Sequence, residues 1–173
     1  MKANNLGVTD ALPVVDWGAI VEKLDAWEGP RPDDHNSRST WLTTINDDGS
    51  PHVTPVGALW LDGTFWFQTG STRKASNIER DPRCSVGTSI RDADVILEGV
   101  AERVTDAEGI AKAAAAWAKG GWPAEPDPTG AGITAPFNAP TQGPPPWTVY
   151  RIAPRSVLVC LGAEPGGLTR FEL

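Results

Sequence analysis

The sequence predicts a mainly β fold, a small antiparallel β-barrel with peripheral helices. Runs of β-branched and aromatic residues recur from about residue 39 to the end of the chain. Short turn signals such as Asp62-Gly63 separate many of these runs, so neighbouring strands are expected to pair as hairpins. A few other stretches space their apolar residues as helices do. About eight short strands in one domain are best protected by closure into a barrel, which removes exposed edges.

The N-terminal part is expected to be peripheral to this barrel. Residues 1–12 are polar and predict a flexible arm. Residues 15–28 carry apolar side chains at helical spacing, with Asp16 as a candidate N-cap. Residues 28–39 contain prolines, a glycine and many polar residues, and therefore predict a loop.

The remaining elements follow from the same signals. In the helix predicted over 71–81, Ser71 or Thr72 is the expected cap and Pro82 ends the helix. A second Ala-rich helix is predicted over 106–119. The predicted strands are 39–46, 51–61, 64–70, 83–90, 94–106, 147–154, 155–161 and 168–173.

Proline and glycine are concentrated between the second helix and the closing strands. Residues 120–146 hold eight of the 16 prolines and five of the 18 glycines, with no strand or helix pattern. A long segment without such a pattern in a compact domain predicts a functional lid or a loop. Trp122 and Trp147 border the segment, so they are candidates to face a pocket beneath it.

Composition excludes several classes of function. The net charge is −7, which disfavours nucleic acid as a partner. No apolar run is long enough for a membrane span or a signal peptide, so we expect a cytoplasmic protein. The length of 173 residues predicts a single domain, residues 1–173. Cys84 and Cys160 lie in apolar strand-like runs and predict buried thiols rather than a disulfide. His35 and His52 with these two cysteines give no metal-ligand spacing.

A local positive patch lies at the start of the helix predicted over 71–81. Residues 72–91 contain five basic and two acidic residues, a net charge of +3. Ser71, Thr72, Arg73 and Lys74 bring hydroxyl and cationic groups to a helix N-terminus, where free N–H groups and the helix dipole favour a phosphate. The alternative is an ordinary solvated helix start.

A second candidate site is the strand that contains Pro55. A proline inside a strand indicates an edge, a bulge or a ligand beside the backbone, and Gly57 permits close approach. A flat heterocycle could then bond the free backbone groups of Thr54 and Val56. The alternative is an irregular edge strand without a ligand. His52 is a candidate general acid or an ordinary strand histidine, and no Ser-His-Asp or Cys-His arrangement can be assembled.

These two candidates lie in a run that resembles a known family. The pattern TWLTTINDDGSPHVTPVGALW, followed by a hairpin and STRKASNIERDPRCS, resembles the pyridoxamine 5′-phosphate oxidase-like superfamily of FMN-binding split β-barrels. The resemblance covers about residues 38–105. It implies a split β-barrel and a homodimer with a flavin-type cofactor at the subunit interface. It also implies cofactor-binding roles for His52, Thr54, Pro55, Val56, Gln68, Thr69, Thr72, Arg73, Lys74 and Asn77.

Departures from the family pattern bear on the cofactor. The FMN-using oxidases have an arginine and a lysine around the ring-binding strand, where this chain has VTPVGA, and an R-x-H motif that this chain lacks. The sequence is instead similar to the actinobacterial flavin/deazaflavin oxidoreductase branch. That similarity implies coenzyme F420, a deazaflavin, and hydride transfer to a small unsaturated acceptor, with His52 a possible proton donor. Arg80, Arg83 and Arg91 are candidates for a groove that holds the anionic tail of F420.

Two alternatives stay open beside this interpretation. One is an FMN-dependent oxidoreductase on the same scaffold. The other is a non-catalytic carrier of flavin or haem, although no histidine after His52 is available as a second axial haem ligand.

Overall fold

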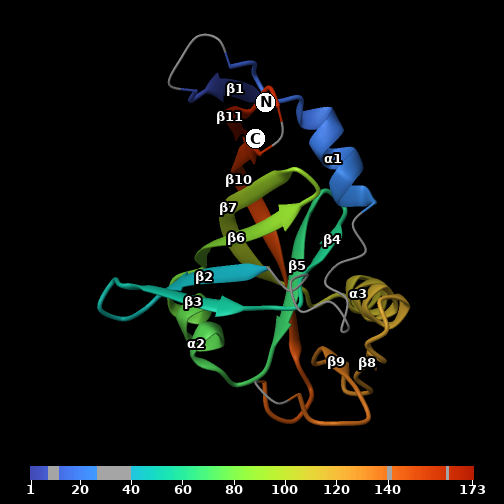
Figure 1. Cartoon of the computed structure of the whole chain (residues 1–173). Coiled ribbons are helices and arrows are strands. Elements are labelled where there is room, and N and C mark those ends of the chain that lie inside the picture. Colours follow the sequence, from blue (N-terminus) through green and yellow to red (C-terminus); the bar gives the residue numbers. More distant parts are fainter. Residues whose placement is uncertain (8–11, 27–39, 140–141, 163) are drawn as a thin grey trace.

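The computed structural model describes residues 1–7, 12–26, 40–139, 142–162 and 164–173. The centre of the described structure is one nine-stranded antiparallel sheet, to which helices and a small two-stranded sheet are attached (Figure 1). The mainly β class predicted from the sequence is therefore confirmed. In chain order the elements are β1 (Lys2–Asn5), α1 (Trp17–Asp25), β2 (Trp41–Ile45), β3 (Pro51–Pro55), β4 (Leu59–Leu61), β5 (Thr64–Thr69), α2 (Arg73–Arg80), β6 (Arg83–Ile90), β7 (Ala93–Arg103), α3 (Ala107–Lys119), β8 (Glu125–Pro126), β9 (Ile133–Thr134), β10 (Thr148–Leu161) and β11 (Gly167–Glu172).

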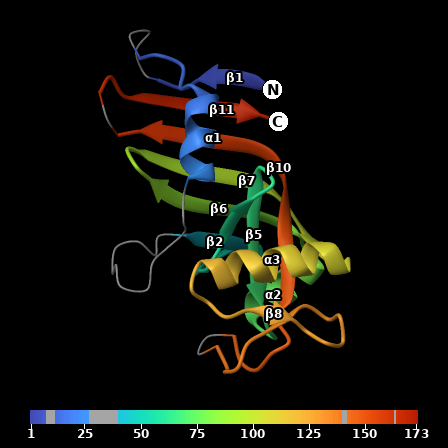
Figure 2. The same cartoon turned by 90° about the vertical axis from the view of Figure 1, so that its right-hand side faces the viewer.

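The long strand β10 joins the two parts of the sheet. One of its edges pairs with β7 over most of its length. The other edge pairs first with β5, at residues 148–151, and then with β11, at residues 156–161. The register shifts between Pro154 and Ser156, where a proline cannot donate to the ladder. The sheet therefore divides at this irregularity. In Figure 2, β1, β11, β10, β7 and β6 run side by side, and β5 crosses them at a steep angle.

The register separates a buried row of side chains from an exposed row next to it. Directly paired residues of β2, β6, β7, β10 and β11 point inward and are at most 2% exposed. Helix α1 closes this core with Ile20 and Leu24. The inward row is Leu42, Val86, Leu97, Val157 and Phe171.

Helix α3 organises a second apolar cluster on the other side of β5. Trp117 of α3 packs there with Trp66 and Val149, and Trp147 is fully buried. Ile133 of β9 exchanges two backbone hydrogen bonds with Trp147, of 2.9 and 2.8 Å. The residues after α3 are thus held against the sheet.

Several predicted elements differ from the structure. The expected arm at 1–12 contributes β1, because residues 2–5 pair with β11. The strand predicted over 51–61 is broken after Pro55, where Val56 donates to the carbonyl of Thr40 and β4 turns to pair with β5. The strands predicted over 147–161 are one strand, β10. The segment 120–146, predicted to lack strands, contains β8 and β9.

Other predictions are confirmed. Asp16 caps α1, and its carboxylate accepts a hydrogen bond from the N–H of Gly18 at 2.9 Å. Asp62 and Gly63 both have positive φ angles, 54° and 74°, as a two-residue hairpin turn requires. Residues 27 and 28 of the predicted helix and the loop predicted over 28–39, with His35, lie outside the described residues.

Candidate functional site

The N-terminus of α2 presents free backbone donors at one end of the sheet. Thr72 is the N-cap in extended conformation, and its Oγ1 accepts a hydrogen bond from the N–H of Ala75 at 3.4 Å. The cap predicted from the sequence is thereby confirmed. Because only one N–H of the first turn is capped in this way, the others remain available to an anion.

Lys74 is a buried cation in the first turn of this helix. Its residue surface is only 5% exposed, and the side chain forms no ion pair or hydrogen bond with another described residue. Burial lowers the pKa of the Lys74 ammonium from its ordinary value of 10.5. A buried, unpaired ammonium is unfavourable unless an anion joins it. This position is therefore the strongest indication of an anionic ligand among the described residues.

The side chain of Arg73, next to Lys74, is exposed. It lines an open pocket of about 520 Å³ with residues of the β2–β3 turn. Positions 73, 76 and 77 share one face of α2, whereas position 74 lies about 100° further round the helix. The described residues that line the pocket are Asn46, Asp47, Asp48, Arg73, Ser76 and Asn77.

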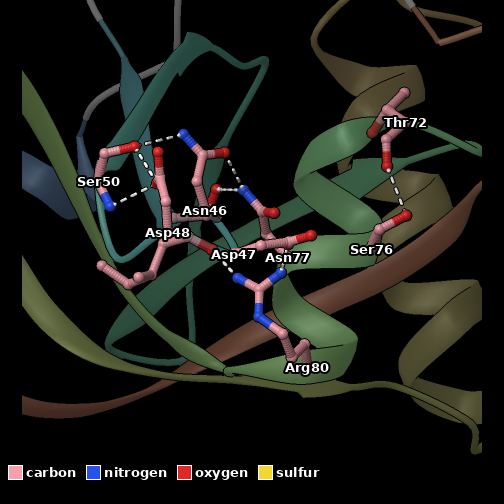
Figure 3. A network of polar contacts seen from close by, with 10 residues as sticks. Asn46, Asp47, Asp48, Ser50, Thr72, Ser76, Asn77 and Arg80 are labelled. Carbon is pink, nitrogen blue, oxygen red and sulfur yellow. Dashed lines mark hydrogen bonds and ion pairs between the residues drawn. The ribbon is translucent and has the colours of Figure 1, made fainter.

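Asn77 fixes α2 against the end of β2. Its amide nitrogen donates to Thr44 Oγ1 and to Asn46 Oδ1, both at 3.1 Å (Figure 3). Asn46 in turn donates to Ser50 Oγ at 3.1 Å, which continues the network into the β2–β3 turn. Asn77 is 2% exposed, so the structure places it as a link between α2 and the strands.

The residues expected to line a cofactor ring lie on both faces of β3. Thr54 pairs with the buried Leu42, and His52 pairs with Thr44, so both share the inward side of the strand. Thr54 Oγ1 is buried and has no hydrogen-bond partner among the described residues. Pro55 alternates with Thr54 and therefore lies on the outward side.

Val56 follows the strand. It is 8% exposed and belongs to the main core.

The end of β5 places two further predicted residues on opposite faces. Gln68 lies on the face of Trp66 and Val149, and its Oε1 is buried without a hydrogen-bond partner in the described chain. Thr69 faces the other way, toward α2. The hydroxyl oxygens of Thr69 and Thr72 are 2.8 Å apart.

The three arginines predicted to form a groove do not lie together. Arg80 pairs with Asp47 and also bonds the carbonyl of Ile45 (Figure 3). Arg83 is held by Asp81 in a 2.6 Å ion pair at the start of β6, and Arg91 follows the opposite end of that strand. That groove is therefore not formed within the described chain.

The cysteines and tryptophans give mixed outcomes. Cys84 is buried as expected, but Cys160 is exposed because it lies on the outward side of β10. Trp122 and Trp147 pack on each other at 5.3 Å between ring centroids, so they anchor the segment between them. The described residues contain no cluster of potential metal ligands, and none of their helices is long and apolar enough to cross a membrane.

The comparisons with known proteins agree with this architecture. The family model "Pyridoxamine 5′-phosphate oxidase" matches residues 35–158, more than two thirds of the chain. The chain belongs to this family. No curated protein matches the sequence significantly. The predicted split β-barrel, with the FMN-binding-like fold of this family, is thereby confirmed.

Three solved structures illustrate the shared fold. A conserved hypothetical protein, Rv2991 from Mycobacterium tuberculosis, is 24% identical, with 87% of this chain and 88% of that chain covered and a TM-score of 0.56. A pyridoxamine 5′-phosphate oxidase-related, FMN-binding protein from Nostoc punctiforme is 17% identical, with 93% of both chains covered and a TM-score of 0.57. PhzG from Burkholderia lata, solved with tetrahydrophenazine-1-carboxylic acid, is 15% identical, with 91% and 83% covered and a TM-score of 0.55.

Three residues of this region were not predicted from the sequence. Asn46 and Ser50 hold the β2–β3 turn beside α2, and the Asp-Gly turn pattern around them is the only signal that pointed there. Gln142 bonds Thr69 across the fold at 3.1 Å, and no local pattern in the sequence indicates it.

Proposed function

We propose that this protein is an oxidoreductase that binds a phosphate-bearing flavin-type cofactor at the N-terminus of α2 and exchanges hydride with a small organic molecule. One observation carries the proposal: Lys74 is buried in the first turn of α2 with no anionic partner among the described residues. A cofactor phosphate supplies the missing negative charge, and the free N–H groups of the turn supply donors.

Buried polar groups on β3 and β5 also support a ligand with hydrogen-bonding groups. The unpartnered oxygens of Thr54 and Gln68 are buried, and each is costly unless a ligand bonds it. Arg73 is exposed beside the turn, where its side chain is free to reach a phosphate. A ligand that combines a phosphate with a flat, hydrogen-bonding ring would pair with the cations and bond the unpartnered oxygens.

The residues of this chain then have distinct roles. The cofactor, when bound, supplies the hydride chemistry of its ring. Lys74 and Arg73 bind its phosphate together with the free N–H groups of the turn, while Thr72 caps α2 and Asn77 holds the helix in place. Thr54 and Gln68 orient the ring, and His52, on the same side of β3 as Thr54, is the candidate proton donor to the reduced acceptor.

FMN is the cofactor that the geometry favours. Coenzyme F420 carries a long anionic tail, and a groove for it requires free cations beyond Lys74. Arg80 and Arg83 are instead engaged by Asp47 and Asp81, and two carboxylates line the pocket beside Arg73. F420 is the second candidate, because the ring-binding strand lacks the arginine and lysine of the FMN-using oxidases.

We also propose that the protein forms a homodimer through the outward face of the sheet. The outward row of the sheet runs from Pro55 through Trp41, Gly87 and Ile96 to Leu158. Trp41 is 48% exposed and Ile96 38% exposed, with only a glycine between them. A face of this kind is typical of a contact between subunits. We also propose a cytoplasmic location, which suits the free thiols of Cys84 and Cys160.

Titration of the purified protein with FMN and with F420, separately, tests the proposal. We expect stoichiometric binding of FMN, which is measured by the quenching of flavin fluorescence. Tight binding of F420 with no binding of FMN would overturn the choice of cofactor, and binding of neither would overturn the proposed function. A bound cofactor that passes hydride to no acceptor in a broad screen would identify a carrier instead of an enzyme.

A further inference from the structure

The end of the Pro/Gly-rich segment lies directly on the turn that precedes α2. Gly70 is the contact point: a Cβ added there would lie 2.1 Å from the carbonyl oxygen of Gln142 and 3.2 Å from Cδ1 of Trp147. Only a glycine allows the two backbones to approach this closely. Residue 142 is therefore held against the turn that leads into the anion site.

Gln142 is also joined to the cap of α2 by a chain of hydrogen bonds. Thr69 Oγ1 donates to Gln142 Oε1 at 3.1 Å, and it lies 2.8 Å from Thr72 Oγ1. A hydroxyl has one proton, so when Thr69 donates to Gln142 it must accept from Thr72. Thr72 then keeps its lone pairs for the N–H of Ala75.

Trp147 anchors the segment close to Gln142. Its ring is completely buried, and its Nε1 donates to the carbonyl of Gly143 at 3.2 Å. Trp122 packs on the same ring, and Ile133 bonds the backbone of Trp147 on the other side. The packing of Trp147 therefore restricts the position of the neighbouring Gln142 side chain.

We propose that Gln142 is a positioning residue of the anion-binding turn. Its amide oxygen fixes the direction of the hydroxyls of Thr69 and Thr72, and so keeps Thr72 in the cap while other N–H groups of the first turn stay free for a phosphate. The inference rests on the proposed function of α2 as a phosphate site. Without Gln142, the Thr69 hydroxyl has only the carbonyl of Gly70, 3.3 Å away, or Thr72 Oγ1 as an acceptor among the described residues, so the direction of both hydroxyls is no longer fixed.

The test compares FMN with riboflavin, which has the same ring and no phosphate. Gln142→Met keeps the length of the side chain and removes the acceptor. Asn138→Met is the matched control, because Asn138 is exposed in the same segment and bonds no other described residue. Dissociation constants are measured from the quenching of flavin fluorescence, and folding is monitored by the Tm of the cofactor-free protein.

We expect Gln142→Met to weaken FMN binding about fivefold, the effect of one lost hydrogen bond, and to leave riboflavin binding unchanged. Thr69→Val should weaken FMN binding as well. The double variant should bind FMN with the same affinity as the weaker-binding single variant, because both residues act through the same series of hydrogen bonds. Gly70→Ala, which forces the segment away, should reproduce the loss selective for FMN.

The possible failures are distinguishable. Wild-type protein that binds no FMN would overturn the proposed function and this inference with it. If the wild-type protein binds FMN and Gln142→Met binds it with the same affinity, only the role of Gln142 would be overturned. An equal loss of FMN and riboflavin affinity would likewise reject a role specific to the phosphate and indicate general support of the fold.

Discussion

Replacement of Lys74 by methionine should lower cofactor affinity without lowering the stability of the cofactor-free protein. The ammonium of Lys74 is buried in the first turn of α2 and forms no ion pair with another described residue. Methionine fills nearly the same volume and has no charge to desolvate. The substitution therefore separates the requirement of binding from the requirement of folding.

The expected magnitudes follow from these contacts. A charge-assisted hydrogen bond contributes about 1.5–3 kcal/mol, so the affinity for FMN should fall about 10- to 150-fold. The cofactor-free variant no longer buries an unpaired charge. Its free energy of unfolding should be unchanged or higher by about 1 kcal/mol, which is about 2–4 °C in Tm for a domain of this size.

The pH dependence gives a second signature. The pKa of Lys74 is lowered in the folded protein, so the unfolded chain binds more protons between that value and 10.5. The stability of the cofactor-free protein therefore gains a contribution as pH rises through this window. FMN binding requires the cation and should weaken over the same window. Both trends should disappear in Lys74→Met.

Fluorescence titration and thermal unfolding measure the two effects, with Lys119→Met as the control. Lys119 is exposed at the end of α3, so the same loss of charge there should leave FMN affinity unchanged. An FMN dissociation constant within twofold of wild type would refute the assignment of Lys74 to the phosphate. A Tm lowered by more than about 5 °C would instead show that the buried ammonium stabilises the fold.

Three further predictions address the interface, the thiols and the link between α2 and β2. Trp41→Glu, on the exposed row of the sheet, should lower the dimer association constant at least about tenfold, and a monomer–dimer equilibrium unchanged in analytical ultracentrifugation would contradict the proposed interface. Burial raises the pKa of Cys84 to about 12, so iodoacetamide at pH 8 should modify only Cys160 in the folded protein and both cysteines after unfolding; rapid modification of Cys84 in native protein, seen by mass spectrometry, would show that its burial is wrong. Asn77→Ala removes the hydrogen bonds to Thr44 and Asn46 and should cost about 1–3 kcal/mol of unfolding free energy; a denaturation midpoint equal to wild type would reject its structural role.

The elements of the site were visible in the sequence because each depends on local chemistry. Thr72 caps α2 by bonding an N–H three residues away, and Pro82 prevents the helix from continuing. Asp62 and Gly63 turn the hairpin because the short polar side chain of Asp62 tolerates a positive φ angle and Gly63 has no Cβ to oppose one. The family resemblance likewise lies within one continuous run of the chain.

The burial of single side chains was harder to predict from the sequence. The periodicity of β10 did not show that Cys160 is on the outward side, because an apolar run has no marked polar face. The strand predicted over 51–61 contains a proline, which signalled an irregularity, but β4 leaves β3 only because it has β5 to pair with. In both cases the partner strands decide the outcome.

The β class, the cap of α2 and the presence of cations beside it follow from local sequence, since each depends on residues within a few positions of one another. Which of these cations are free depends on the packing of distant segments. Arg80 and Arg83 are taken by Asp47 and Asp81, whereas Lys74 is buried without a partner among the described residues. The tertiary structure also brought Gln142 to Thr69, 73 positions away, because β5 and β10 pair side by side and carry the two segments to the same edge. Contacts of this range depend on how strands pair across the sheet, and the local chain does not encode them.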